Sequence, residues 1–230
     1  MALILSIETS TTVCSAALHQ AGTLVASLEI HQEYSHASKL APLIDQLCKL
    51  SGYPVSKIGA IAISAGPGSY TGLRIGTSLA KGLCYSNNLP IIAISSLQVL
   101  GLKIAETNAG NDLLCPMIDA RRMEVYSQVF DRSLKERNSI EAVIVNENSY
   151  SEFLDGQAVI FFGNGSDKCR EIIRHPNAKF LSGITPSAIQ LGTLAYQKWK
   201  ADKFEDIHQF VPFYLKEFFT KKTPETLNET

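Results

Sequence analysis

The apolar and polar positions of the first half of the chain predict a run of strands followed by alternating helices and strands. Short apolar runs bounded by turn residues are typical of buried strands, and an apolar position every three to four residues is typical of a helix. We expect Gly52 to end the first helix and Ser95 to cap the third. The predicted strands are residues 3–7, 13–18, 23–30, 58–64 and 90–94, and the predicted helices are residues 35–51, 71–86 and 95–106.

The second half repeats this order after a polar linker at residues 108–112, which predicts a boundary between two lobes. Two lobes of βββαβα topology predict an α/β protein, and this arrangement resembles the actin-like ATPase (ribonuclease H-like) fold. We predict an N-terminal lobe at 1–108, a C-terminal lobe at 109–220 and a disordered polar tail at 221–230. The second half is predicted to hold strands at 113–119, 123–130, 142–146 and 158–162, and helices at 150–154, 166–174 and 186–200.

The composition narrows the classes of function. Of 230 residues, 45% are hydrophobic and 19% are charged, as in a globular chain with a sizeable core. The formal net charge of -1 gives no overall positive field, so we expect a partner to hold most of any RNA. The 5 cysteines form no CxxC pair and are predicted to be reduced core residues. No basic leader and no apolar run of roughly 20 residues is found, which predicts a soluble, cytoplasmic protein.

Two loops are candidates for binding an anion. The turn Glu8–Thr12 offers several hydroxyl groups, although the same residues suit a tight hairpin. The stretch Gly66–Gly76 lies between a buried strand and a helix, where free N–H groups and the helix dipole favour an anion. It lacks the Lys-Ser/Thr pair of a Walker A loop. The alternative is that its first two glycines permit a sharp turn while Ser69 or Thr71 caps the helix.

The helix after this loop contains three glycines, each costing about 1 kcal/mol relative to alanine. Gly72, Gly76 and Ala80 recur every four residues and form a smooth strip, which either faces its own sheet or receives a helix of a second subunit. The preceding helix has an apolar arc wider than one-sided packing requires, so it either lies deep in the fold or contacts a partner, and both helices are candidates for one dimerisation surface. Replacing Gly76 by leucine is then expected to abolish dimerisation and leave the monomer folded. The candidate interface residues are Leu40, Leu43, Ile44, Leu47, Gly72, Leu73, Gly76, Leu79, Ala80 and Leu83.

Several motifs resemble one pair of protein families. The segment Ile4–Ser10 resembles the opening of the TsaB and TsaD families, and Gly66–Gly76, which reads GPGSYTGLRIG, closely resembles a signature of both. Asp119–Arg121, followed by Glu124–Tyr126, is similar to the TsaB (YeaZ) family in particular. The resemblance covers the whole chain in order and length. TsaD carries a His-x-x-x-His metal pair on a helix where this chain has Ser96 and Leu100.

The resemblance implies a non-catalytic scaffold or dimerisation subunit. Its complex transfers a threonylcarbamoyl group to the adenosine next to the anticodon in tRNAs reading ANN codons. The implied partners are the catalytic subunit TsaD, in a heterodimer, and the ATPase TsaE, with a homodimer when TsaD is absent. Contact with tRNA is implied only through the complex, and contact with a membrane is not implied. The resemblance implies no catalytic residue, no cofactor or cofactor-binding residue, and no metal ligand in this chain.

Other residues leave alternatives open. Asp119 with Arg121 and Arg122 either orients a phosphate-bound metal or is a turn aspartate beside solvated arginines. The stretch Gly163–Ser166 resembles an adenosine-contacting position of the superfamily, or is a turn with an N-cap. His31 and His36 lack the spacing of a metal pair. The alternative function is a small-molecule kinase or ATPase of the same fold, which needs a catalytic carboxylate and a complete phosphate site in each lobe. A metalloprotease would need the missing histidine pair.

Overall fold

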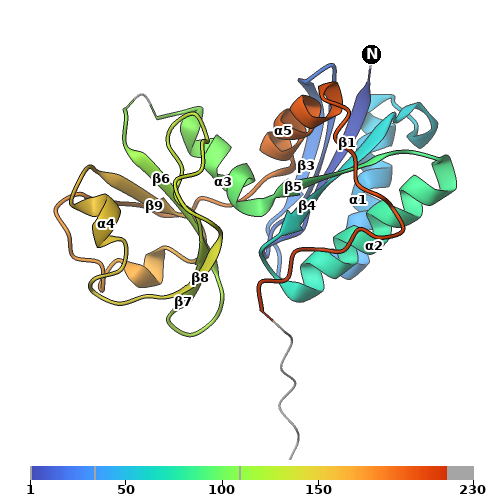
Figure 1. Cartoon of the computed structure of the whole chain (residues 1–230). Coiled ribbons are helices and arrows are strands. Elements are labelled where there is room, and N and C mark those ends of the chain that lie inside the picture. Colours follow the sequence, from blue (N-terminus) through green and yellow to red (C-terminus); the bar gives the residue numbers. More distant parts are fainter. Residues whose placement is uncertain (1, 34, 109, 217–230) are drawn as a thin grey trace, which may run out of the picture.

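The protein consists of two lobes that lie side by side, each built on a five-stranded sheet (Figure 1). The computed structural model describes residues 2–33, 35–108 and 110–216. Within these ranges no helix is long and apolar enough to cross a membrane. The predicted α/β class and the repeated order of elements are confirmed.

The first sheet has the strand order β3-β2-β1-β4-β5. The first three strands form an antiparallel meander, and β4 and β5 continue the sheet parallel to β1. The central strand β1 is buried along its whole length, which explains why its sequence is one apolar run. The strands are Leu3–Glu8 (β1), Cys14–Gln20 (β2), Thr23–Ile30 (β3), Ala60–Gly66 (β4) and Ile91–Ser95 (β5).

Helices cover both faces of this sheet. α1 (His36–Ser51) and α2 (Tyr70–Asn87) pack on one face, where Leu5 and Ile7 belong to their core cluster. α5 (Ala188–Lys200) packs on the other face, against Ile4 and its neighbours. Successive residues of a strand point to opposite faces, so β1 supplies both cores. Gly52 ends α1 with φ 75°, as predicted.

The second sheet has the order β10-β9-β6-β7-β8, so its connections repeat those of the first sheet. In both sheets the first strand of the half is central, the next two lie to one side and the last two to the other. The short helix α4 (Ser151–Leu154) stands where α1 stands in the first half. The strands are Leu113–Asp119 (β6), Glu124–Ser127 (β7), Glu141–Ile144 (β8), Val159–Phe162 (β9) and Ala178–Leu181 (β10).

The last helix of each half packs on the sheet of the other half. α3 (Ser96–Ala105) places Leu97, Leu100 and Ile104 in a cluster with second-sheet residues, while α5 covers the first sheet. After α5 the chain stays on the first lobe, where the Phe213 N–H donates to the Ala65 carbonyl at 2.7 Å. Residues 188–213 therefore pack with the first lobe, which corrects their assignment to a lobe at 109–220. An amphipathic pattern shows that a helix covers a sheet and does not show which sheet.

Several predicted elements differ from the structure. The predicted helix 166–174 is a single turn of 3-10 helix, Asp167–Cys169 (η2), and the short strand β10 was not predicted. The predicted strand 123–130 ends at Ser127, beyond which Phe130 forms only isolated bridges. Ser95 occupies the N-cap position of α3, but its hydroxyl makes no capping bond. The tail predicted at 221–230 lies outside the described residues.

Candidate docking surface and glycine loop

The glycine loop connects β4 to α2 at the carboxyl end of the first sheet. Gly66 has φ 107°, a conformation that glycine adopts without steric cost, and the Gly66–Pro67 peptide is cis. Ser69 caps α2, because its Oγ accepts a hydrogen bond from the Gly72 N–H at 3.3 Å. The Ser69 N–H donates to the Ser10 carbonyl at 2.7 Å and ties the loop to the β1–β2 turn. The loop is thus a sharp turn with a helix cap, which was one of the two predicted alternatives.

The glycine strip of α2 faces the protein's own β1–β2 turn. A Cβ atom added at Gly72 would clash with the Thr9 carbonyl oxygen, and one at Gly76 would clash with Thr9 Oγ1. The same atom at Gly76 would lie 3.1 Å from Ile63 Cδ1. The expectation that leucine at Gly76 leaves the monomer folded is therefore wrong, because a leucine side chain has no room there. The strip brings α2 close to its own lobe.

The β1–β2 turn is buried beneath the glycine loop. Glu8 Oε1 accepts hydrogen bonds from the Ser10 N–H at 2.6 Å and from the Ser64 hydroxyl at 3.1 Å. Burial raises the pKa of Glu8, because a charged carboxylate would lose its hydration there. Glu8 Oε2 and the hydroxyls of Thr9 and Ser10 are buried and have no hydrogen-bond partner among the described residues. Of the turn's hydroxyl residues only Thr12 is exposed, so the turn does not present several side-chain donors to a phosphate.

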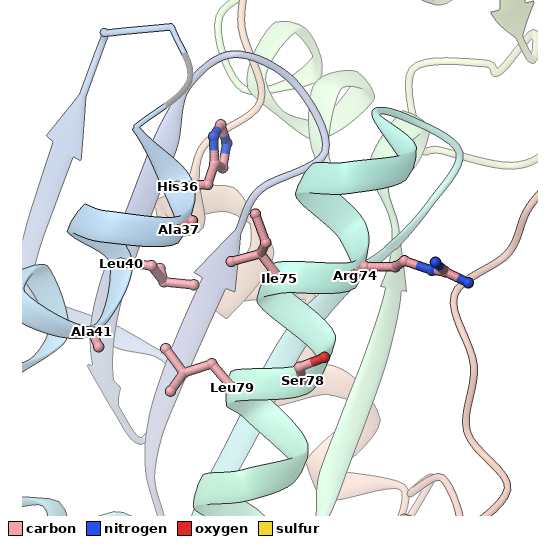
Figure 2. A pocket seen from close by; sticks show the side chains of 8 residues that line it. All are labelled: His36, Ala37, Leu40, Ala41, Arg74, Ile75, Ser78 and Leu79. Carbon is pink, nitrogen blue, oxygen red and sulfur yellow. The ribbon is translucent and has the colours of Figure 1, made fainter. Parts of the chain in front are cut away.

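An open apolar groove runs between α1 and α2 (Figure 2). Its cavity has a volume of about 440 Å³. Ala37 and Ala41 of α1 are exposed along it, and Ile75 and Leu79 of α2 are half-buried. We call this groove, together with the adjoining Gly82 and Leu83, the docking surface. The groove is lined by His36, Ala37, Leu40, Ala41, Arg74, Ile75, Ser78 and Leu79.

Two large apolar side chains are exposed in the last turns of the same helices. Leu50 of α1 is 75% exposed and Tyr85 of α2 is 78% exposed. At the other end, burial lowers the pKa of His36, so its imidazole is neutral at physiological pH. Apart from Arg74, the groove is lined by small, apolar or uncharged side chains, and such a surface is suited to contact with another protein.

The predicted interface residues divide between this surface and the core. Leu79 and Leu83 are half-buried on the docking surface, and Leu40 lines its groove although it is 1% exposed. The other predicted residues are buried in the first lobe, which leaves them little area for a partner. The predicted set leaves out Ala37, Ala41 and Ile75, although the helical period places them beside the predicted residues. The buried residues are Leu40, Leu43, Ile44, Leu47, Gly72, Leu73, Gly76 and Ala80.

In the TsaD family a helix carries a pair of metal-binding histidines, and the corresponding positions of α3 in this chain are Ser96 and Leu100. Ser96 and Leu100 are both fully buried, and the Ser96 hydroxyl lies 3.2 Å from the Ser64 hydroxyl. His31 is exposed and lies 3.3 Å from a carboxylate oxygen of Glu29. Across the described part of the chain, no group of three or more His, Cys, Asp or Glu side chains could hold a metal ion.

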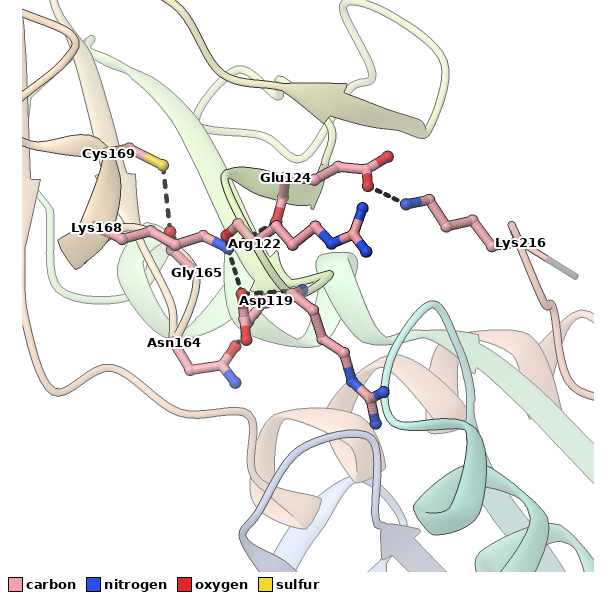
Figure 3. A network of polar contacts seen from close by, with 9 residues as sticks. Asp119, Arg122, Glu124, Asn164, Gly165, Lys168, Cys169 and Lys216 are labelled. Atoms are coloured by element: carbon pink, nitrogen blue, oxygen red, sulfur yellow. Dashed lines mark hydrogen bonds and ion pairs between the residues drawn. The ribbon is translucent and has the colours of Figure 1, made fainter. Parts of the chain in front are cut away.

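The turn between β6 and β7 holds a polar network in the second lobe (Figure 3). Asp119 forms an ion pair with Lys168, and its N–H donates to Asn164 Oδ1 at 3.2 Å. Glu124, the first residue of β7, forms an ion pair with Lys216 near the end of the described chain. Asn164 therefore supports the turn, in agreement with the turn interpretation of Gly163–Ser166.

The sequence matches known proteins along most of its length. A family model described as TsaD, tRNA N6-adenosine threonylcarbamoyltransferase, matches residues 24–218. The "tRNA threonylcarbamoyladenosine biosynthesis protein TsaB" of Escherichia coli K12 is 30% identical over 220 residues, which cover 93% of this chain and 94% of that protein. The chain belongs to the TsaB family. The TsaB protein of Bacillus subtilis 168 is also 30% identical, over 227 residues and 93% of each chain.

Solved structures agree with membership of the TsaB family. "YeaZ from Pseudomonas aeruginosa" has a TM-score of 0.78 and 27% identity, covering 94% of this chain and 100% of that one. A second Pseudomonas aeruginosa structure, of a protein "with similarity to peptidase YEAZ", has a TM-score of 0.84 and 26% identity with the same coverage. A dehydratase activator from Clostridium difficile is 11% identical with a TM-score of 0.50, covering 88% of this chain and 96% of that one, and shares the fold alone. These matches confirm the actin-like ATPase fold.

Proposed function

We propose that this chain is a non-catalytic subunit that supports threonylcarbamoyl transfer to the adenosine next to the anticodon in tRNAs reading ANN codons. It docks a TsaD-like catalytic subunit on the α1/α2 docking surface. A TsaE-like ATPase joins that assembly, and a second copy of the chain occupies the surface when the catalytic subunit is absent. Contact with tRNA is indirect, through the complex, in the cytoplasm.

The observation that carries this proposal is the apolar surface itself. Leu50 and Tyr85 are among the most exposed large apolar side chains of the described residues. Fully burying one such side chain contributes about 1.5–3 kcal/mol, so two of them would make a large contribution to binding. Earlier in the same two helices lie exposed small residues, Ala41, Ser78 and Gly82, over which a partner helix can approach closely.

The buried positions of Ser96 and Leu100 support the non-catalytic part of the proposal. Serine and leucine at i and i+4 cannot replace two imidazoles as ligands of one metal. The core around them leaves no opening toward solvent, since both side chains are fully buried. The chemistry of the complex would therefore belong to the partner, and this chain would contribute a folded surface.

The alternative, a small-molecule kinase or ATPase, has less support. A kinase or ATPase of this fold needs a catalytic carboxylate and a complete phosphate site in each lobe. Glu8, Thr9 and Ser10 are buried, and the Asp119 carboxylate is already paired with Lys168. The residues of the two turns thus do not fit a magnesium-bound nucleotide.

Co-purification of matched variants with a TsaD-like partner tests the proposal. Leu79→Glu places a charge in the docking surface, and burying an unpaired charge at an interface costs several kcal/mol, so we expect at least a hundredfold weaker heterodimer. Ile144→Glu is the control, because Ile144 is 72% exposed on β8 in the other lobe. Both variants should keep the wild-type circular dichroism spectrum. Equal binding of the two variants would contradict the assignment of the surface.

Reconstituted tRNA modification tests the role. The isolated chain, given tRNA and a threonylcarbamoyl-adenylate donor, should form no product. Product should appear with the catalytic partner and wild-type chain, fall sharply with Leu79→Glu and persist with Ile144→Glu. Modification of tRNA by the isolated chain would refute the non-catalytic role.

A further inference from the structure

Lys168 belongs to η2, and its side chain extends to the β6–β7 turn (Figure 3). Its Nζ donates to the carbonyl oxygens of Arg122 and Glu124, each at 2.7 Å, and pairs with the Asp119 carboxylate. An ammonium group has three N–H donors, so all three are used on this one turn. The side chain is only 24% exposed, far less than the other lysines in ion pairs of this lobe.

The turn that surrounds this ammonium has an unusual backbone. Arg121 and Arg122 have φ values of 68° and 51°, a left-handed pair that glycine and asparagine usually form in tight hairpins. In this conformation one carboxylate oxygen and two carbonyl oxygens converge on a single point. Without a cation there, the three oxygens would repel one another and their partial charges would be unmet.

We propose that this turn is a cation site of the second lobe and that the protein fills it with its own Lys168 ammonium. Carboxylate and carbonyl oxygens are hard ligands of the kind that alkali and alkaline-earth ions take. An ammonium ion and a potassium ion have similar sizes, so the three oxygens of the turn can bind either ion. This inference is independent of the proposed docking role.

The internal cation has a consequence for the rest of the turn. Asp119 and Glu124 are the carboxylates closest in sequence to Arg121 and Arg122, and they are already paired with Lys168 and Lys216. Among the ion pairs of the described residues, none involves either arginine. Lys168 therefore keeps the carboxylate away from a phosphate-bound metal and fixes a turn that carries two exposed guanidinium groups.

Chemical rescue of Lys168→Ala tests this assignment. The part of the lysine side chain that alanine lacks consists of three carbons and the ammonium group. The n-propylammonium ion has the same structure as this missing part. We expect Lys168→Ala to lower the melting temperature by about 5 °C or more, since three charged hydrogen bonds are lost. Tens of millimolar n-propylammonium should restore at least half of that loss. Tetramethylammonium, which has no N–H donor, should restore none at the same ionic strength.

A second lysine provides the matched control. Lys179 pairs with Asp112 at 2.7 Å on the surface of the same lobe and is 55% exposed. Lys179→Ala should lower the melting temperature by about 2 °C or less, with no response to n-propylammonium. If Lys168→Ala does not fold, Lys168→Met keeps most of the stem, and ammonium or potassium ions should then stabilise it relative to tetramethylammonium. Wild-type stability in either Lys168 variant, or loss without any rescue, would overturn the proposal.

Discussion

Replacing Gly76 by alanine is expected to destabilise the protein, whereas the same replacement at Gly82 is expected to stabilise it. Both glycines lie inside α2, and alanine is favoured over glycine in a helix interior by about 1 kcal/mol. Their surroundings differ. A Cβ atom at Gly76 would clash with Thr9 Oγ1 and lie 3.1 Å from Ile63 Cδ1, whereas a Cβ atom at Gly82 would meet nothing within 4 Å.

The sizes of the two effects follow from this difference. Forcing an extra carbon into a packed core costs about 1–3 kcal/mol, and the tight contacts at Gly76 favour the upper end of that range. After subtraction of the gain in helix propensity, Gly76→Ala should lower the free energy of unfolding by about 2 kcal/mol. Gly82→Ala should raise it by about 1 kcal/mol. For a chain of this length the melting temperatures of the two variants should differ by about 6–12 °C.

Thermal and urea unfolding of both variants would measure these effects. The measurement is best made in a Leu79→Glu background, so that the proposed self-association on the docking surface does not add to the apparent stability. Gly82 lies on that surface, which makes the precaution necessary. If both alanine variants shifted in the same direction by similar amounts, the packing of the strip against Thr9 would be wrong, and the strip would face outward.

Two further predictions concern buried groups of the first and second lobes. Burial raises the pKa of the Glu8 carboxyl above 4.5, its value in the unfolded chain. Above pH 4.5 the folded chain therefore retains a proton on Glu8 that the unfolded chain has lost, and the free energy of unfolding falls as the pH rises. Glu8→Gln should flatten that fall, and parallel curves of unfolding free energy against pH for the two proteins would contradict it. Burial also raises the pKa of Cys84 to about 12 and those of Cys14 and Cys169 to about 11. All five thiols are buried and should react with a thiol reagent only after unfolding; rapid labelling of the native chain would refute this.

The elements of the first lobe could be predicted because their local patterns are strong. β1 and β4 are buried on both faces, and such strands appear as continuous apolar runs that few other structures produce. α1 ends at Gly52 in the left-handed conformation that a glycine signals. In the second lobe β10 is short and half-exposed, so its pattern was too weak to separate a strand from a loop.

The glycine strip of α2 shows a limit of the local sequence pattern, because the pattern does not identify which residues pack against the strip. Glycine at Gly72 and Gly76 indicates that some backbone or side chain comes close, and the sequence left open whether it belongs to the same lobe or to a partner. The structure identifies Thr9, more than sixty residues earlier in the chain, as that neighbour. The same limitation applied to the interface prediction, in which most residues turned out to be core.

By itself the sequence determined the α/β class, the two-fold repeat of its elements, the absence of a histidine pair at Ser96 and Leu100, and the family to which the chain belongs. Each of these depends on residues that are neighbours along the chain or on a motif read in order. Only the tertiary structure decided that α5 returns to the first sheet, that the strip faces Thr9, and that Lys168 fills the β6–β7 turn. These contacts join segments far apart in sequence, and the packing of the whole chain selects them from many arrangements that the local pattern permits equally well.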